Sequence, residues 1–199
     1  MAYLKEFAIF TDIFFSSCEM FKKFAPDESI SSTSQIKNSV QRGIINQILH
    51  EYPLLEDCID IVLPKKALLI AKAPENVQLL IVADEILFYN QKDGPFMPTL
   101  KFLHKYPNMM NKMQVDKGAI RFILSGSNIM CPGFTSPGGS MPTSIEEGKP
   151  VAIYAEGKSS AMAVGITKMS TDKIASVNKG VAVENVHYLM DGLWQSGTL

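Results

Sequence analysis

The chain of 199 residues has few of the side chains that usually hold metals or form disulfides. Its three cysteines, Cys18, Cys58 and Cys131, are too far apart in the sequence to suggest a metal knuckle or a redox pair. Their odd number and wide spacing are typical of reduced, intracellular thiols. The three histidines are equally scattered. The composition therefore predicts neither a zinc site nor a disulfide.

An excess of basic charge is also missing, because 19 Lys and Arg residues stand against 20 Asp and Glu residues. Proteins that coat nucleic acid are usually basic, since phosphate neutralisation supplies most of their affinity. Any contact with RNA is therefore expected to be local or to be assisted by a second surface. No apolar run approaches the roughly 18 residues that a membrane helix needs, so no membrane contact is expected.

The usual sequence motifs of enzymes are absent. The chain has neither of the glycine-rich phosphate-binding motifs G-x-x-x-x-G-K-[ST] and G-x-G-x-x-G, and it lacks the nucleophile elbow G-x-S-x-G. Cys131 could be drawn as a thiol nucleophile with His104 or His187 as its base. A small apolar residue at the end of a strand is the simpler interpretation of Cys131. We predict that the chain is not an enzyme and uses no cofactor.

Residues 20–110 are expected to fold as a small α+β domain. Ser32-Thr33-Ser34-Gln35 has the form of a capping box, in which a hydroxyl at the helix cap is followed three residues later by Gln. Apolar residues then recur every four positions and predict a helix that ends before Pro53. These residues are Ile36, Val40, Ile44 and Ile48. Strands are expected near residues 67–71, 77–81 and 86–89, and short helices near residues 56–62 and 99–106.

Residues 111–194 are expected to form a second domain, followed by a tail of residues 195–199. Asp116 can cap a helix over residues 117–125, and Gly126 stands where a left-handed C-terminal cap belongs. A loop is expected at residues 132–142, which hold three Pro and three Gly. Short strands at residues 128–131, 151–155, 162–166 and 181–186, with a helix at 171–178, predict a small closed or nearly closed barrel.

One segment of the second domain suggests a binding surface. Lys117 and Arg121 are four residues apart and are expected on one side of a helix start, where backbone N–H groups attract phosphate. Gly118 and Ala119 between them remove side-chain bulk, so another backbone could approach closely. The alternative is a tight packing contact flanked by two solvated cations, and the spacing alone leaves both interpretations open.

Several sequence blocks of the second domain resemble a PUA domain. They are VDKGAIRFILSGSNIMCPG at residues 115–133, VG at 164–165, ST at 170–171, NKG at 178–180 and NVHYLMDGLW at 185–194. More narrowly, the chain from residue 20 resembles the malignant T-cell-amplified sequence family. The blocks that carry this match are MFKKF at 20–24, LPKK at 63–66, GPF at 94–96, PTL at 98–100 and LHKYP at 103–107. Residues 1–19 have no counterpart in the family, and Glu6 and Asp12 make a secretory signal unexpected there.

This resemblance implies an α+β domain followed by a PUA pseudobarrel, in a cytoplasmic translation factor. Family members pair with the density-regulated protein on the small ribosomal subunit. The pair promotes release of deacylated tRNA, reinitiation and some non-standard initiation. The first domain is the expected site for the partner and the subunit, and the PUA domain is expected to meet the tRNA acceptor end. Zinc in this family belongs to the partner.

The expected RNA-facing edge borders the helix start and the first barrel strand. We predict that it includes Lys117, Gly118, Arg121, Asn128, Gly133 and, as a weaker candidate, Lys179. Lys65 and Lys66 are candidates for contact with ribosomal RNA. Ser136, which precedes Pro137, is a candidate for proline-directed phosphorylation in a loop that is expected to be exposed.

The chain departs from the PUA pattern at two places. Many PUA domains carry Gly-Asp before the third strand, whereas this chain has Gly148-Lys149, so a structural bond of that Asp is expected to be missing. The loop after Phe134 also carries an additional small run, Gly138-Gly139-Ser140.

Two other functions remain open at this point. One is a ribosome-biogenesis factor of similar size that also ends in a PUA domain and acts on the precursor of the large subunit. The other is an accessory RNA-binding subunit of an RNA-modifying enzyme, since PUA domains often target such enzymes. The blocks GPF and PTL of the first domain favour the translation factor over the biogenesis factor.

Overall fold

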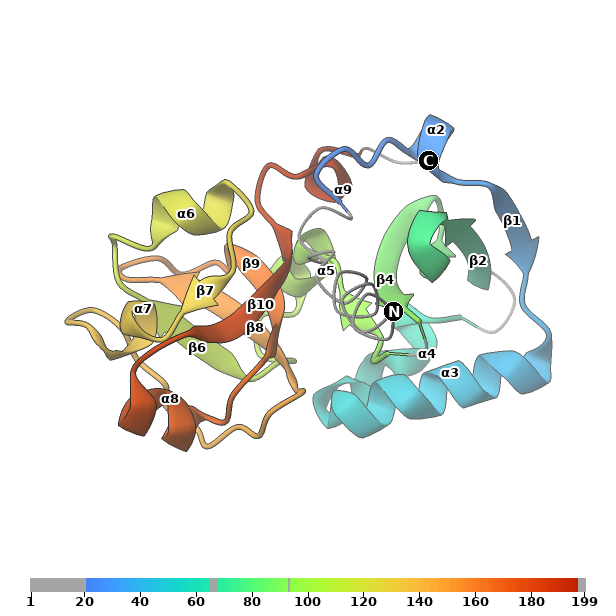
Figure 1. Cartoon of the computed structure of the whole chain (residues 1–199). Helices are drawn as coiled ribbons and strands as arrows, with labels where there is room; N and C mark the ends of the chain where they lie inside the picture. The colour runs from blue at the N-terminus through green and yellow to red at the C-terminus, as the bar shows by residue number, and fades with distance from the viewer. Residues whose placement is uncertain (1–20, 65–67, 93, 197–199) are drawn as a thin grey trace, which may run out of the picture.

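The computed structural model of the chain describes residues 21–64, 68–92 and 94–196, which form two domains side by side (Figure 1). Each domain is built around one five-stranded sheet. Residues 1–19, with Cys18, and the lysines Lys65 and Lys66 lie outside the described residues.

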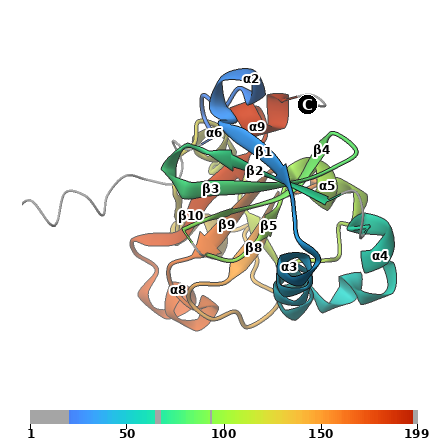
Figure 2. The same cartoon turned by 90° about the vertical axis from the view of Figure 1, so that its right-hand side faces the viewer.

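The sheet of the N-terminal domain is antiparallel throughout, with the strand order β1-β2-β3-β4-β5. Its strands are β1 (Ser32–Gln35), β2 (Leu68–Ala73), β3 (Val77–Val82), β4 (Glu85–Gln91) and β5 (Met97–Pro98). The helices are α2 (Pro26–Ser29), α3 (Asn38–Glu51), η2 (Pro53–Cys58), α4 (Ile59–Val62), η3 (Pro74–Asn76) and α5 (Leu100–Lys105). Figure 2 faces this domain and shows α3 nearly end-on beside the sheet.

The prediction of a capping box at residues 32–35 was wrong. Those residues form β1, which pairs with β2 at the edge of the sheet, and α3 begins at Asn38 without a side-chain cap. Hydroxyl side chains suit an exposed strand as well as a helix cap, and backbone pairing with β2 decides between the two. The apolar face of α3 is also shifted, because Val40 is 52% exposed while Gln41 is buried with Ile44 and Ile48.

The sheet of the C-terminal domain has the strand order β6-β8-β9-β10-β7, and it curls into a half-barrel. Only the β6 and β8 pair among its described strands is parallel. The strands are β6 (Lys112–Val115), β7 (Ile129–Met130), β8 (Pro150–Ala155), β9 (Ala163–Thr167) and β10 (Val181–Tyr188). The helices are α6 (Ile120–Leu124), α7 (Pro132–Thr135), α8 (Thr171–Val177) and α9 (Gly192–Gln195).

Three details of this domain correct the sequence prediction. Sequence analysis missed β6, which is short and becomes a strand by pairing with the distant β8. The predicted helix at 117–125 shrinks to α6, because residues 117–119 form a turn. The segment 132–142 is not all loop, since its first residues form α7. Gly126 does take a positive φ of 91° after α6, as predicted, and α8 ends on a left-handed Asn178.

A seam of buried residues joins the two domains. One apolar cluster contains most of the N-terminal core together with Ala152, Tyr154, Ala161, Val164, Val186 and Leu193 of the C-terminal domain. One part of this contact, which we call the domain seam, consists of Phe21, Tyr89, His187, Asp191 and Gly192. The Gly192 N–H donates to the Phe21 carbonyl over 2.7 Å. A Cβ atom on Gly192 would stand 2.3 Å from the Phe24 carbonyl oxygen, so only glycine allows this approach.

The Asp191 carboxylate satisfies several polar groups of the domain seam. Asp191 Oδ2 lies 2.7 Å from His187 Nδ1 and accepts from the Tyr188 N–H, and Oδ1 caps α9 by accepting from the Trp194 N–H. The His187 ring packs edge-on against both Phe21 and Tyr89. One carboxylate therefore fixes the end of β10, the start of α9 and the orientation of an interdomain ring.

Candidate nucleic-acid interface

A groove of about 640 Å³ opens on the C-terminal domain between α6 and the β7–α7 segment. We call it the α6 groove. It is lined by Asp116, Gly118, Ala119, Arg121, Phe122, Ile123, Ser127, Asn128, Ile129, Met130, Pro132 and Gly133. Its volume falls within the range of about 300–1,000 Å³ that is common for small-molecule sites. Most of these side chains are apolar, so the walls favour a flat or apolar group.

Small residues bring the two walls of the α6 groove together. The Asp116 N–H donates to the Gly133 carbonyl over 2.9 Å, and Asp116 Oδ1 accepts from the Ala119 N–H over 2.9 Å. A Cβ atom on Gly133 would lie 3.5 Å from Ala119 Cβ, which is an ordinary contact distance. The hydrogen bond from Asp116 to Gly133 thus holds the turn before α6 against α7, whereas no other described backbone segment approaches Gly118 closely.

Two apolar side chains of the α6 groove are exposed to solvent. Phe122 on α6 is 51% exposed and Met130 on β7 is 47% exposed. Their immediate neighbours Ile123 and Ile129 are buried in the core of the domain. The Arg121 guanidinium lies 4.6 Å from the centre of the Phe122 ring, so one cation stands directly beside the exposed aromatic group.

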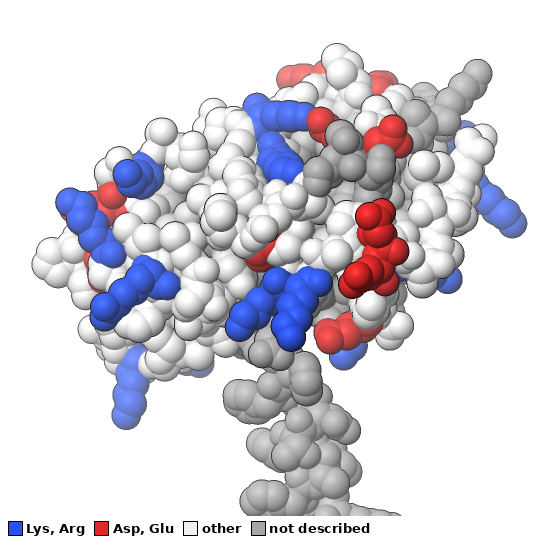
Figure 3. Space-filling model, turned by 90° about the horizontal axis from the view of Figure 1, so that it is seen from above, with Lys and Arg blue, Asp and Glu red and all other residues white. Residues whose placement is uncertain are grey.

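The surface around α6 carries basic charge. On the face seen from above, Lys and Arg side chains are spread over the C-terminal domain, whereas the larger groups of Asp and Glu lie over the N-terminal domain (Figure 3). Lys117 is exposed and lies 3.8 Å from Glu156, an ion pair that solvent weakens. Lys117 and Arg121 thus place two cations at the start of α6, next to the carboxylates of Asp116 and Glu156.

The structure brings together four of the six predicted RNA-facing residues in the α6 groove, namely Gly118, Arg121, Asn128 and Gly133. Asn128 also has a structural role, because its Oδ1 accepts from the Asn185 N–H of β10. Lys117 is exposed in the turn before α6 and does not line the groove. Lys179 is exposed beyond α8 and also lies outside the lining. The predicted RNA contacts themselves remain predictions.

The structure favours the packing interpretation of Cys131. Its thiol is buried, donates to the Lys179 carbonyl and touches Met169 Sδ, while His187 is engaged with Asp191 and His104 Nε2 lies 2.7 Å from the Ala161 carbonyl. Burial raises the pKa of the Cys131 thiol, which keeps it protonated at neutral pH. The proposed nucleophile and its two candidate bases therefore have separate structural partners.

Ser136 and Lys149 also have defined positions. Ser136 is partly buried directly after α7, where its N–H donates to the Pro132 carbonyl, and its phosphorylation stays a prediction. Lys149, which replaces the acidic residue of many PUA domains, lies 3.4 Å from Glu51 of α3. The positive charge of Lys149, where many PUA domains have a negative one, thus forms an ion pair between the two domains.

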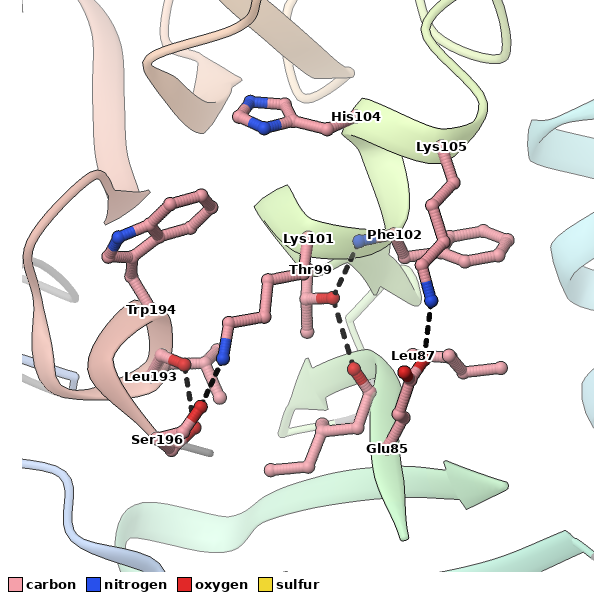
Figure 4. A pocket seen from close by; sticks show the side chains of 11 residues that line it. Glu85, Leu87, Thr99, Lys101, Phe102, His104, Lys105, Leu193, Trp194 and Ser196 are labelled. Carbon is pink, nitrogen blue, oxygen red and sulfur yellow. Dashed lines mark hydrogen bonds and ion pairs between the residues drawn. The ribbon is translucent and has the colours of Figure 1, made fainter. Parts of the chain in front are cut away.

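A second cleft, of about 360 Å³, lies between β4 and α5 on one side and α9 on the other (Figure 4). Its basic side chains already have partners: Lys105 lies 2.7 Å from Glu85, and Lys101 donates to the Ser196 carbonyl. The His104 ring packs against Trp194. The contacts of Lys101 and His104 join the two domains, so we assign this cleft to their interface.

The parts of the chain that the structure describes offer neither a cluster for a metal ion nor a helix that could cross a membrane. Within them, no group of three or more His, Cys, Asp or Glu side chains is placed to hold a metal ion. Among the same residues, no helix combines the length and the apolar character that crossing a membrane requires.

Phe122 and Met130 were not among the site residues predicted from the sequence. Each stands next to a core isoleucine in a short apolar run, and such a run does not reveal which of its members face solvent. A helix of five residues and a strand of two residues can bury only some of the apolar side chains in these runs. This excess of apolar residues is the only sequence signal that could have pointed to Phe122 and Met130.

Comparison with known proteins agrees with this architecture. Residues 24–107 match the Pre-PUA-like domain, and residues 111–189 match the PUA domain. A hypothetical protein of Pyrococcus horikoshii has a similar fold, with a TM-score of 0.67 at 24% identity over 82% of this chain and 98% of that one. The molecule is thus a two-domain, RNA-binding PUA protein, as the resemblance implied.

Sequence relatives define the family more narrowly. Malignant T-cell-amplified sequence 1 of Danio rerio is 51% identical over 180 residues, which are 90% of this chain and 99% of the relative. The Drosophila melanogaster homologue is 52% identical over 179 residues, or 89% of this chain and 98% of the relative. The chain belongs to the malignant T-cell-amplified sequence family.

Proposed function

We propose that the protein is a non-enzymatic translation factor that acts with a density-regulated-type partner on the small ribosomal subunit. In this proposal it promotes release of deacylated tRNA, reinitiation and non-standard initiation in the cytoplasm. The PUA domain contacts the tRNA acceptor end, and the N-terminal domain contacts the partner and the subunit.

The observation that carries the proposal is the α6 groove of the PUA domain. Its apolar walls and the adjoining Arg121 suit a nucleic-acid end, because bases present apolar faces and phosphates carry the negative charge. Membership of the family, with nearly full-length coverage of its relatives, adds the role in translation that the sequence resemblance implied.

The small net charge limits how tightly the protein alone can hold RNA. A site that neutralises few phosphates has low affinity for free RNA and loses much of it as salt rises. A second contact with the ribosome or a partner turns the RNA contact into an intramolecular event at high effective concentration. We expect weak binding to free tRNA and firm binding to the small subunit only with the partner. Nanomolar binding of the isolated chain to naked tRNA at physiological salt would contradict this mechanism.

The first test is sedimentation of the labelled full-length protein with separated ribosomal subunits, with and without the co-expressed partner. Selective comigration with the small subunit, strengthened by the partner, supports the proposal. Comigration only with precursors of the large subunit would indicate a biogenesis factor instead. Comigration with neither, together with co-purification of an RNA-modifying enzyme, would indicate an accessory subunit.

A variant test addresses the basic surface at α6. The double substitution Lys117→Glu and Arg121→Glu should reduce tRNA release on the small subunit, while circular dichroism stays unchanged because both side chains are exposed. Lys173→Glu on α8 is the matched control, since Lys173 is also exposed but lies on a different element of the same domain. If the double variant is unfolded, Lys117 and Arg121 stabilise the fold and their proposed role in RNA binding is contradicted.

A further inference from the structure

We propose that one helical face of the N-terminal domain docks a basic, amphipathic segment of another protein. The face consists of Leu54, Glu56 and Asp57 on η2 together with Asp60 and Ile61 on α4, and we call it the η2–α4 face. It is separate from the α6 groove, which lies on the C-terminal domain. The inference goes beyond the proposed function and does not depend on it.

The first argument is the exposure of two large apolar side chains. Ile61 is 79% exposed and Leu54 is 69% exposed, the two highest values among the large hydrophobic side chains that the structure describes. The core does not require either of them, since their neighbours Leu55 and Val62 are buried to 1% and 5% exposure. Exposed apolar side chains that gather on one surface mark an interaction site more often than isolated ones do.

The two apolar side chains are close enough for one docked segment to contact both. Leu54 and Ile61 are seven residues apart in consecutive helical turns, and seven helical residues rise about 10–14 Å. A helix of about ten residues covers this length. Figure 2 shows α4 at the periphery of the N-terminal domain, where another protein can approach it.

The second argument is a groove of about 490 Å³ that begins at Leu54 and runs between the two domains. Leu54 lines it together with Pro53, Met109 and Met110. The two methionines are 6% and 5% exposed, and methionine side chains adapt to apolar groups of different shapes. The rest of the lining is mostly polar and includes Glu146 of the C-terminal domain. The groove therefore offers room for a further side chain of a segment that docks on Leu54.

The third argument is the charge of the η2–α4 face, which determines the chemistry of its partner. Glu56, Asp57 and Asp60 are exposed, and none of them forms an ion pair with a described residue. Residues 51–64 hold four acidic side chains and no Lys or Arg, and the two lysines that follow lie outside the described residues. Such a face repels RNA, whereas Lys and Arg side chains of a protein complement it. A basic segment with apolar side chains on one side fits both features.

The test measures binding of the full chain to two fluorescent peptides of about 14 residues, a length of about four helical turns. The first peptide contains only Leu and Lys, with the Leu residues spaced to form one face of a helix. The second peptide has Glu in place of every Lys. We expect the Leu/Lys peptide to bind and the Leu/Glu peptide to bind at least about tenfold more weakly, because only the first complements the acidic side chains.

Variants of the apolar side chains locate the bound peptide. Ile61→Ser and Leu54→Ser should each weaken binding of the Leu/Lys peptide about tenfold, equivalent to about 1.4 kcal/mol. Both variants should remain folded by circular dichroism, since both side chains are mostly exposed. Val177→Ser on α8 is the matched control, because Val177 is 52% exposed on the other domain, and it should have no effect.

Variants of the acidic side chains test the charge. Asp57→Lys combined with Asp60→Lys should weaken binding of the Leu/Lys peptide about tenfold at low salt. The difference from the wild type should shrink as the salt concentration rises, because exposed charges are screened. Glu28→Lys on α2 is the matched control, since Glu28 is exposed in the same domain but lies outside the face.

Three outcomes would overturn the inference. The first is equal binding of the two peptides by the wild-type protein. The second is wild-type affinity for the Leu/Lys peptide in the folded Ile61→Ser and Leu54→Ser variants. The third is a wild-type protein that forms dimers in analytical ultracentrifugation and becomes monomeric on Ile61→Ser, which would show that a second copy of the chain covers the face. None of these results concerns the small subunit, so sedimentation with ribosomal subunits tests the proposed function separately.

Discussion

The domain seam and the α6 groove use similar residue types in opposite ways. In the seam, the Phe21 and His187 rings are buried and Asp191 satisfies three groups of the protein itself. In the groove, the Phe122 ring is half exposed and Arg121 has no acidic partner among the described residues. Aromatic and charged side chains thus stabilise the fold where they are buried against other groups of the protein, and remain available for a ligand where they are exposed to solvent.

This comparison predicts that changes in the seam alter stability, whereas changes in the groove alter binding. The largest effect is expected for Asp191→Ala, which removes the acceptor of the Tyr188 and Trp194 N–H groups and the partner of His187. Leaving these buried groups without a partner should lower the free energy of unfolding by about 3 kcal/mol. Urea unfolding followed by circular dichroism measures this change in the free energy of unfolding. Asp172→Ala, at an exposed position of α8, is the control and should change stability by less than about 0.5 kcal/mol.

The next effect is expected for Gly192→Ala. The new Cβ atom would stand 2.3 Å from the Phe24 carbonyl oxygen and 2.5 Å from the Phe24 nitrogen, so the backbone of one segment must move. Such overpacking should lower the free energy of unfolding by about 2 kcal/mol.

Gly43→Ala on α3 is the matched control for this substitution. A Cβ atom there meets nothing within 4 Å, so alanine should raise helix stability by about 0.5–1 kcal/mol. Equal effects of the two substitutions in thermal unfolding would show that the seam is not closely packed at Gly192.

A smaller effect, of opposite sign, is expected for Tyr89→Phe. The Tyr89 hydroxyl is buried without a hydrogen-bond partner, and burial, with a smaller contribution from Asp191, raises its pKa well above the usual value. Removing this hydroxyl should stabilise the protein by up to about 1 kcal/mol.

Tyr52→Phe is the comparison for this tyrosine. The Tyr52 hydroxyl donates to the Phe96 carbonyl over 2.9 Å, so its loss should destabilise the protein by about 1 kcal/mol. If both variants lose stability equally in denaturant titrations, the Tyr89 hydroxyl has a partner in solution.

The smallest effect on stability is expected in the groove, for Phe122→Leu. Half of this ring is already exposed, so the free energy of unfolding should change by less than about 0.5 kcal/mol. Ile123→Val, one residue along the same helix, removes a buried methyl group and should cost about 1 kcal/mol. A large loss of stability in Phe122→Leu, measured by the same unfolding assay, would contradict the prediction that only the seam residues stabilise the fold.

The sequence by itself determined the two-domain order and most of the local structure. Apolar spacing located the strands near residues 77–81 and 151–155, and the block VDKGAIRFILSG identified the PUA domain. These features depend on neighbouring residues along the chain. Gly118 and Gly133, which the sequence placed at the RNA-facing edge, both line the α6 groove.

Tertiary structure decided the features that depend on distant residues. Ser32–Gln35 became a strand because β2 pairs with it, and the parallel β8 partner made residues 112–115 a strand. The sequence shows an apolar residue at 122 but not its exposure, since the core can bury only one face of a short helix. Packing of the core buries some apolar and charged side chains and leaves others exposed. Only the tertiary structure therefore decides which of them are available for a ligand.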